Sequence, residues 1–502
     1  MPTHHYLAFD LGASSGRAML GTLKNGKLSI RELHRFENRM SFLFGHYYWN
    51  IVHLLDEIKK GLRKCALICP VPDAIGVDTW GVDYALITKD GSLSGLPYAY
   101  RDNRTHRTIP KLLKKISKRD IFNRTGLQHL YFNTIFQIHS AVSDTAAELA
   151  AADAFFMIPD LINYYLTGRK FNEFTDASTS ALVHPATRNW DATLIKTTGA
   201  KRSLFQKIVM PGTKIGVLQN HLAAETGMSR VPVLATASHD TAAAVASIPA
   251  EGKEWAFISS GTWSIMGIEV PDAIINDRAF RYNFSNEGGI NNTYRFLKNI
   301  TGMWIVQQCR EKWRHEARGT RREESDISFS HLTGMAQQAT PFKSYINPDD
   351  PLFANPQDMP KAIKTYCKNT RQNVPSTPGA IIRCVLESLA FTYRTTLDQL
   401  REVSPHQIKT LHIIGGGTKN RLLCQMAADA CGIPVVTGPV EGTAMGNLLV
   451  QAWGLGHLKD VQNIRQVVRA SEKIERYAPQ DTSTWEKEYT RYRTIVQKRR
   501  NA

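Results

Sequence analysis

The feature that most constrains the fold is a turn of small residues between two apolar runs, and this feature occurs twice in the chain. The first copy covers residues 6–20 and the second covers residues 255–269. In each copy the apolar runs predict two strands, and the glycine and hydroxylated residues between them predict a tight turn. We therefore expect each half of the chain to be built on such a hairpin.

The first turn also has the composition of an anion-binding site. No bulky side chain stands between Leu11 and Arg17, so backbone N–H groups can approach a ligand closely, and phosphate is the natural ligand. Asp10 is a candidate Mg²⁺ ligand, because this hard cation prefers carboxylate oxygen. The alternative is an ordinary hairpin whose glycines only form the turn. Two such turns facing each other across a cleft would hold a triphosphate from both sides.

A second polar segment follows a short predicted strand at residues 74–78. This strand leads into Asp78, Trp80 and Asp83. Ligands of open α/β sheets bind at the carboxyl ends of strands, and a tryptophan ring beside acceptor carboxylates suits a sugar. The polar loop at residues 100–105 is predicted equally well to contact the substrate or to form surface ion pairs.

The segment 231–246 joins an apolar strand to an alanine-rich helix through Ser238, His239, Asp240 and Thr241. Ser238, Asp240 or Thr241 is expected to cap this helix, and one interpretation is that Asp240 does nothing more. His239, Asp240 and Thr241 are three polar residues in a row at the end of a strand, which favours a functional role instead.

A third strand-to-helix junction contains the glycines of residues 415–417. Their backbone can lie flat against a planar or anionic group such as adenine or phosphate. The spacing is not G-x-G-x-x-G, so it does not predict a dinucleotide site. Residues 21–28 begin like a P-loop, but Leu28 stands where a Mg²⁺-binding Ser or Thr is needed, and Asn25-Gly26 predicts a hairpin turn.

The order of predicted elements near the start is three strands, a helix and a strand, which indicates a mixed α/β sheet with a crossover helix. Residues from about 106 to 235 are rich in predicted helices and form an insertion, and residues 315–330 are predicted to be an exposed loop. A long helix is predicted from Gly379 to about Glu402, with Thr377 as its N-cap.

Composition limits the classes of function. A chain of 502 residues predicts two or three domains. The net charge is +17, but Lys and Arg are spread along the chain, which favours solvated helix faces over a nucleic-acid groove and is compatible with attraction of an anionic nucleotide. Seven scattered cysteines, with Cys65 and Cys69 interpreted as packing, together with no leader and no long apolar run, predict a cytoplasmic protein.

These motifs together resemble the FGGY family of carbohydrate kinases. The matching segments are residues 10–17, 78–83, 100–102, 238–241, 259–264, 286–289, 297–299 and 415–417. The resemblance covers nearly the whole chain and implies a duplicated actin-like, ribonuclease H-like ATPase fold, with mixed sheets flanked by helices and a cleft between two lobes. It implies a sugar-binding N-terminal domain at residues 1–244, carrying the helical insertion, and a nucleotide-binding C-terminal domain at residues 245–502.

The resemblance also assigns roles. Asp240 matches the catalytic base, and Asp10 matches a carboxylate that holds Mg²⁺, usually through water. The residues that match ATP contacts are Ala13, Ser14, Ser15, Gly16, Arg17, Thr262, Gln307 and Gly417. The residues that match sugar contacts are Gly81, His239, Asp240, Thr241 and Asn299.

The implied reaction is phosphoryl transfer from MgATP to the 1-hydroxyl of a ketose, by a monomer or homodimer that binds neither nucleic acid nor membrane. L-rhamnulose is the expected sugar, mainly because of the Thr79-Trp80 and His239-Asp240-Thr241 motifs. The alternatives are another sugar, such as L-fuculose, xylulose or a polyol. An actin-like protein that binds nucleotide or sugar without catalysis is the alternative of a different class.

Overall fold

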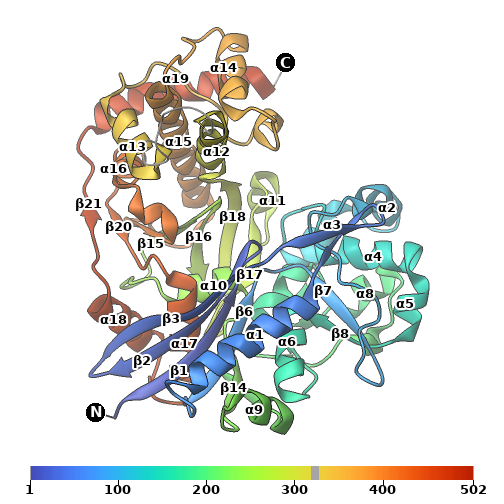
Figure 1. Ribbon diagram of the computed structural model, residues 1–502. Coiled ribbons are helices and arrows are strands. Elements are labelled where there is room, and N and C mark those ends of the chain that lie inside the picture. Colours follow the sequence, from blue (N-terminus) through green and yellow to red (C-terminus); the bar gives the residue numbers. More distant parts are fainter. Residues whose placement is uncertain (1, 318–326, 501–502) are drawn as a thin grey trace. The chain divides into compact units, whose positions relative to one another are not determined.

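The computed structural model describes residues 2–317 and 327–500, and their side chains as far as residue 497 (Figure 1). Residues 318–326, in the middle of the segment predicted to be an exposed loop, lie outside the described residues. The chain divides into two compact units. The first unit is Met1–Glu251, Glu269–Leu297 and Glu441–Lys473, and the second is Gly252–Ile268, Lys298–Val440 and Ile474–Ala502. The predicted boundary after residue 244 stays a prediction.

The first unit is organised around a mixed sheet with the strand order β13-β14-β6-β1-β2-β3. Its strands are β1 (His4–Leu11), β2 (Ser15–Lys24), β3 (Lys27–Glu37), β6 (Ala74–Thr79), β13 (Thr213–Val217) and β14 (Pro232–Ala235). β1 runs antiparallel to β2 and parallel to β6, and β6 runs parallel to β14. Three neighbouring parallel strands therefore end at the same edge of the sheet.

Both faces of this sheet are covered, which explains why β1 is almost continuously apolar. Leu7 and Phe9 pack on the face that carries α1 (Ile51–Ala66). Tyr6 and Ala8 point to the opposite face, which carries α10 (Asp240–Ala246) and α17 (Gly442–Gly454). The alternation follows from the two-residue period of a strand.

The predicted order of three strands, a helix and a strand is confirmed, but the prediction missed one hairpin of two short strands. A hairpin of β4 (Met40–Leu43) and β5 (His46–Trp49) lies between β3 and α1. The other small strand pairs are β7 (Tyr84–Thr88) with β8 (Ala152–Met157), β9 (Asn172–Glu173) with β12 (Ile208–Val209), and β10 (Val183–His184) with β11 (Asn189–Trp190).

The remaining helices of the first unit are mostly short. They are α2 (Arg104–Leu113), α3 (Lys118–Thr125), α4 (Thr134–Asp144), α5 (Ala146–Ala151), α6 (Ile158–Thr167), α7 (Phe174–Ala177), α8 (Ala192–Thr198), α9 (Asn220–Thr226), α11 (Asp277–Tyr282) and α18 (Val461–Ser471). Eight of these helices, α2 to α9, lie between residues 104 and 226, in the segment predicted to be rich in helices.

A second sheet has the strand order β17-β18-β16-β15-β19-β20-β21. Its strands are β15 (Trp255–Ser260), β16 (Trp263–Val270), β17 (Ser285–Gly288), β18 (Tyr294–Thr301), β19 (Thr410–Ile414), β20 (Val435–Thr437) and β21 (Arg476–Tyr477). β15 runs antiparallel to β16 and parallel to β19, which is how β1 runs relative to β2 and β6. The two predicted hairpins therefore occupy equivalent positions in two similar sheets.

The helices of the second unit are longer. They are α12 (Trp304–Ala317), α13 (Phe329–Gln338), α14 (Met359–Asn369), α15 (Pro378–Val403), α16 (Arg421–Cys431) and α19 (Thr482–Arg500). The predicted cap of α15 is confirmed, because the Thr377 hydroxyl accepts a hydrogen bond from the backbone N–H of Ala380 at 3.2 Å. This hydroxyl satisfies one of the backbone donors that a helix start leaves unpaired.

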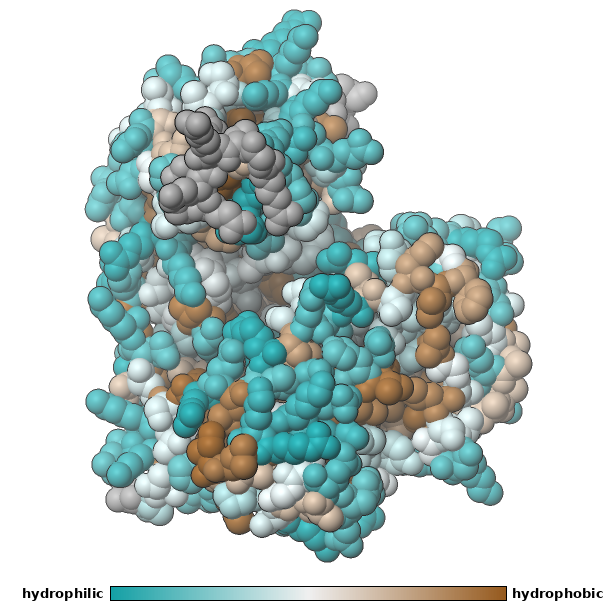
Figure 2. All heavy atoms as spheres, in the orientation of Figure 1, coloured by the Kyte–Doolittle hydropathy of each residue, from teal (hydrophilic) through white to brown (hydrophobic). Residues whose placement is uncertain are grey.

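The described surface is mostly hydrophilic, with small hydrophobic patches on the face that Figure 2 shows. The most exposed large apolar side chains include Phe44, Leu67 and Val52, at 95%, 87% and 72%. Within the described residues, the structure contains no helix that is both long enough and apolar enough to span a membrane.

The contact between α10 and α17 generates a stability prediction. A Cβ at Gly446 would lie 1.7 Å from the carbonyl oxygen of Ala243, so Gly446→Ala must push the two helices apart. We expect a loss of about 1–3 kcal/mol in the free energy of unfolding, measured by urea denaturation. Gly334→Ala in α13 is the matched control, because no atom lies within 4 Å of its added Cβ. The control should be neutral or gain up to about 1 kcal/mol, and equal losses in both variants would contradict the close packing.

Candidate active site

Three carboxylates stand at the shared edge of the first sheet, where β1, β6 and β14 end. Asp10 and Asp78 are paired in register on β1 and β6, and Asp240 begins α10 shortly after β14. Burial raises the pKa of all three, and the charge of Asp10 raises the pKa of both Asp78 and Asp240. The structure therefore gathers three carboxyl groups where the sequence predicted ligand binding at strand ends.

Asp240 is the carboxylate that solvent reaches most easily, with its side chain 33% exposed against 8% for Asp10. Its Oδ1 accepts hydrogen bonds from the backbone N–H and the hydroxyl of Thr241, at 2.5 and 3.0 Å. Burial raises its pKa to about 6, and these bonds act in the opposite direction. Asp240 is thus largely ionised at neutral pH and can accept a proton.

The N-cap of α10 differs from the prediction. His239 holds this position in extended backbone, and Asp240 is the first helical residue. The Asp240 carboxylate is therefore turned back on its neighbour Thr241 and does not cap the helix. The interpretation that Asp240 serves only as a helix cap is wrong.

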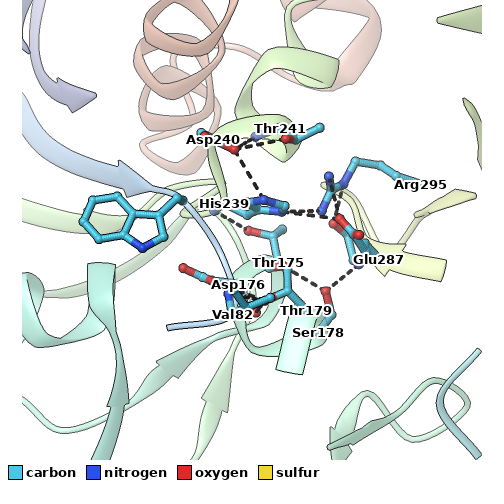
Figure 3. A network of polar contacts seen from close by, with 12 residues as sticks. Val82, Thr175, Asp176, Ser178, Thr179, His239, Asp240, Thr241, Glu287 and Arg295 are labelled. Atoms are coloured by element: carbon cyan, nitrogen blue, oxygen red, sulfur yellow. Dashed lines mark hydrogen bonds and ion pairs between the residues drawn. The ribbon is translucent and has the colours of Figure 1, made fainter. Parts of the chain in front are cut away.

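His239 links Asp240 to a buried ion pair (Figure 3). An Arg295 Nη2–H group donates to His239 Nδ1 at 3.0 Å. Burial, together with the Arg295 charge, holds the His239 pKa well below its usual range, so the ring is neutral. Because Nδ1 accepts this hydrogen bond, Nε2 carries the ring hydrogen. The Nε2 atom lies 3.3 Å from Asp240 Oδ1.

Arg295 has no solvent-exposed side-chain surface. Its Nη1 lies 3.3 Å from the Glu287 carboxylate and its Nε donates to the Gly288 carbonyl at 2.9 Å. Burial raises the pKa of Glu287, and the Arg295 charge opposes that rise. A guanidinium needs such a partner away from water, because an uncompensated buried charge is strongly destabilising.

A buried glutamate fixes the backbone before His239. One oxygen of Glu173 accepts from the hydroxyl of Thr175 at 2.6 Å and from the backbone N–H of Ser238 at 3.3 Å. The Thr175 hydroxyl also accepts from the backbone N–H of His239 at 3.1 Å. The start of α7 therefore positions the end of β14 (Figure 3).

Gly81 lies beside the turn of 3₁₀ helix at Ser178–Ser180, which directly follows α7. The backbone N–H of Val82 donates to the Thr179 hydroxyl at 2.9 Å, and a Cβ at Gly81 would lie 2.9 Å from this side chain. A glycine is therefore required for the close approach of the two segments. Within the first unit, the structure brings Gly81, His239, Asp240 and Thr241 to one region, whereas Asn299 belongs to the second unit.

The structure contradicts the predicted sugar-binding role of Trp80 and Asp83. Trp80 is 5% exposed and its ring packs on Trp49, with the centroids 4.1 Å apart. Asp83 is fully buried and accepts hydrogen bonds from the Trp49 and Trp80 indoles at 2.6 and 3.0 Å and from Gln137 at 2.9 Å. Both residues hold the strand end together and offer no free surface to a ligand.

The turn at Ala13–Arg17 retains donors for an anion. In the described chain, the backbone N–H groups of Ala13 and Ser14 donate to no other protein group. Asn38 holds the turn, because its side chain donates to the Gly12 carbonyl at 2.9 Å. A Cβ at Gly16 would lie 2.2 Å from the Phe36 ring, so that glycine also serves packing.

Arg17 is occupied within the protein. Its guanidinium forms ion pairs with Asp10, at 2.5 Å, and with Glu441. Asp78 Oδ2 accepts from the Asn447 amide at 2.5 Å, whereas Asp78 Oδ1 is buried and has no hydrogen-bond partner among the described residues. Two neighbouring carboxylates with an unsatisfied oxygen are a donor set that fits a hard divalent cation such as Mg²⁺.

The remaining predicted nucleotide contacts lie in the second unit. The Thr262 carbonyl accepts from the backbone N–H of Trp304 at 3.1 Å, at the start of the helix that carries Gln307. A Cβ at Gly417 would lie 2.0 Å from Ser260 Oγ, so only glycine fits against the second hairpin. The structure therefore brings this hairpin, α12 and the glycine junction together.

Sequence reasoning missed the residues that surround His239. Arg295, Glu173 and Thr175 were not predicted, and Glu287 entered only as part of a turn motif. A signal for Arg295 was present, since it is a single charge inside the apolar run of residues 294–297. Glu173 gave no comparable signal, because its segment resembled a polar loop.

Two family models match most of the chain. The N-terminal domain of the FGGY family of carbohydrate kinases matches residues 5–246, and its C-terminal domain matches residues 256–455. The rhamnulokinase of Bacteroides thetaiotaomicron is 42% identical over 492 residues, covering 98% of this chain and 99% of that protein. The rhamnulokinase of Bacillus subtilis is 40% identical over 476 residues, covering 95% and 96%.

Solved structures are similar in fold. The ligand-bound xylulose kinase of Lactobacillus acidophilus aligns with a TM-score of 0.80 at 17% identity, covering 98% of each chain. The glycerol kinase of Plasmodium falciparum with ADP aligns with a TM-score of 0.80 at 14% identity, covering 99% of this chain and 98% of that chain. The predicted mixed sheets flanked by helices are confirmed, and the chain belongs to the FGGY family of carbohydrate kinases.

Proposed function

We propose that the protein transfers a phosphoryl group from MgATP to the 1-hydroxyl of L-rhamnulose, giving L-rhamnulose 1-phosphate and ADP, in rhamnose catabolism. Identity of 42% and 40% to two rhamnulokinases over nearly the full chain supports the choice of sugar. The observation that carries the chemistry is a partly exposed Asp240 with a raised pKa at the carboxyl edge of the sheet. A cytoplasmic monomer or homodimer is part of the proposal.

Asp240 accepts the proton of the sugar hydroxyl, and His239 and Arg295 position it. The His239 Nε2–H group faces the Asp240 oxygen and fixes the direction of the carboxylate. Arg295 fixes the tautomer of His239, and Glu287 balances the charge of Arg295. Gly81, His239, Thr241 and Asn299 are the remaining sugar contacts of the proposal.

The proposed contacts of the nucleotide are the turn at residues 13–17 in the first unit and Thr262, Gln307 and Gly417 in the second unit. The free N–H groups of Ala13 and Ser14 suit anionic oxygens. Asp10 would hold Mg²⁺, and the cation would supply positive charge to offset the charge that develops on the phosphoryl oxygens. Arg17 holds Asp10 in place, since its guanidinium is bound to that carboxylate.

The sugar is tested with a panel of ketoses in an assay that measures ADP release. We expect L-rhamnulose to have the highest kcat/KM, ahead of L-fuculose and xylulose. A higher value for either competitor would reassign the substrate within the family. ATP hydrolysis without any sugar phosphate would favour the non-catalytic actin-like alternative instead.

Asp240→Asn removes the proton acceptor and keeps the size of the side chain. We expect kcat to fall by roughly 10² to 10⁴, the usual contribution of a general base, while the affinity for ADP stays unchanged. The control is Asp56→Asn in α1, which removes a surface carboxylate paired with Lys60 at 3.2 Å. Near-normal turnover in Asp240→Asn would reject the assignment.

The pH profile identifies the titrating group. A base must be deprotonated, and burial raises the pKa of Asp240 to about 6, so kcat/KM should rise with pH through about 6 and then level off. His239 is already neutral throughout this range, because its pKa is held well below the usual value. The residual activity of His239→Gln should show the same rise with pH through about 6. If that rise is lost in the variant, the titrating group is His239.

The buried ion pair is tested by a double-mutant cycle. Arg295→Gln leaves the Glu287 carboxylate buried without its partner and should cost about 3–5 kcal/mol in the free energy of unfolding. Glu287→Gln leaves the Arg295 charge uncompensated and should also destabilise. The double variant should lose less than the sum of the two singles. Strict additivity by urea denaturation would contradict an energetically coupled pair.

A further inference from the structure

The second unit contains a cavity of about 990 Å³ that the proposed reaction does not use. Segments 338–344 and 370–377, the first turns of α15 and the end of α19 line it. None of the predicted nucleotide or sugar contacts of this unit, namely Thr262, Asn299, Gln307 and Gly417, is among the lining residues. Its volume is at the upper end of the range of small-molecule sites, which is about 300–1,000 Å³.

The charged side chains that line the cavity are mostly cationic. They are Lys343, Arg371, Arg383 and Arg491, with Glu387 as the single carboxylate. Glu387 is already satisfied, because Arg383 Nε donates to it at 2.7 Å and the backbone N–H of Phe342 donates to it at 3.0 Å. The excess positive charge of the lining therefore has no carboxylate within the cavity to balance it.

Two of the four cations are available to a ligand. Among the described residues, Lys343 and Arg371 have no acidic partner within 4.0 Å and donate no side-chain hydrogen bond. Arg491, in contrast, donates to the backbone carbonyls of Phe342 and Lys343 at 2.9 and 3.2 Å and pairs with Glu488 at 3.2 Å. Arg491 and Arg383 thus build the wall, and Lys343 and Arg371 are free to bind an anion.

The wall of the cavity is rigidly held. Phe342 and Arg371 adopt the left-handed backbone conformation, with φ of 58° and 57°, which non-glycine residues seldom adopt. The Phe342 backbone is fixed by Glu387 on its N–H side and by Arg491 on its carbonyl side. The Gln372 side chain exchanges hydrogen bonds with the Tyr345 backbone at 2.8 and 2.7 Å. A backbone fixed in this way loses little conformational entropy when a ligand binds.

We propose that this cavity binds a small organic polyanion, a metabolite that carries phosphate or several carboxylates, through Lys343 and Arg371. The planar guanidinium of Arg371 matches the paired oxygens of either group. The start of α15 adds partial positive charge at the same wall, where Thr377 and Ala380 line the cavity. The site is independent of the proposed kinase reaction.

The test measures binding of inorganic pyrophosphate and of citrate to the full-length protein by isothermal titration calorimetry. The test variant is Lys343→Gln/Arg371→Asn, in which asparagine is chosen because it tolerates left-handed backbone. The control is Lys361→Gln/Lys368→Gln on α14, which removes two exposed cations outside the lining. Each double variant lowers the net charge of +17 by two, so non-specific attraction is matched.

We expect at least one of the two anions to bind the wild type. Its affinity should fall by about tenfold or more in Lys343→Gln/Arg371→Asn and by less than about twofold in the control. A stronger response to pyrophosphate identifies a phosphorylated ligand, and a stronger response to citrate identifies a carboxylate. Equal losses in the two variants, or no binding of either anion to the wild type, would overturn the proposal. Thermal unfolding of both variants verifies that they are folded.

Discussion

The rest of the site depends on repulsion among three carboxylates that share one edge of a sheet. Asp10, Asp78 and Asp240 end or follow three adjacent parallel strands, and burial makes the ionised form of each costly. Such a cluster is stable only if opposite charge is supplied or if a carboxyl group takes up a proton. Arg17 supplies part of that charge, a divalent cation suits the remaining oxygens, and the exposed member of the cluster is the one that we propose as the proton acceptor.

Buried charged groups around His239 fix the orientation of the Asp240 carboxylate. Arg295 is fully buried, and its contact with the ring nitrogen forces His239 to present its N–H to Asp240. The buried Glu287 offsets the guanidinium. Glu173 and Thr175 accept hydrogen bonds from the backbone N–H groups of Ser238 and His239, and these bonds set where the chain leaves β14. The geometry around Asp240 therefore rests on buried polar groups that are linked to one another by hydrogen bonds and ion pairs.

Local signals were sufficient for most of the elements, because strands and turns depend on residues close in sequence, although the β4–β5 hairpin and the N-cap of α10 were not predicted. The two hairpins, the long helix after Thr377 and the junction at residues 231–246 all fall in this class. Contacts between distant segments were not predictable. The sequence predicted Trp80 and Asp83 as sugar contacts. In the structure Trp80 packs on Trp49, and Asp83 accepts hydrogen bonds from Trp49, Trp80 and Gln137. Arg295 reaches His239 across 56 residues, a distance at which no periodic pattern indicates contact.

The central claim is that the Asp240 carboxylate takes the proton of the sugar hydroxyl. The most direct measurement is a crystal structure of the protein with its ketose bound. The account predicts an Asp240 oxygen about 2.6–3.2 Å from the 1-hydroxyl, the distance that proton transfer requires. A ketose bound with that hydroxyl out of reach of Asp240, and beside another base, would contradict it.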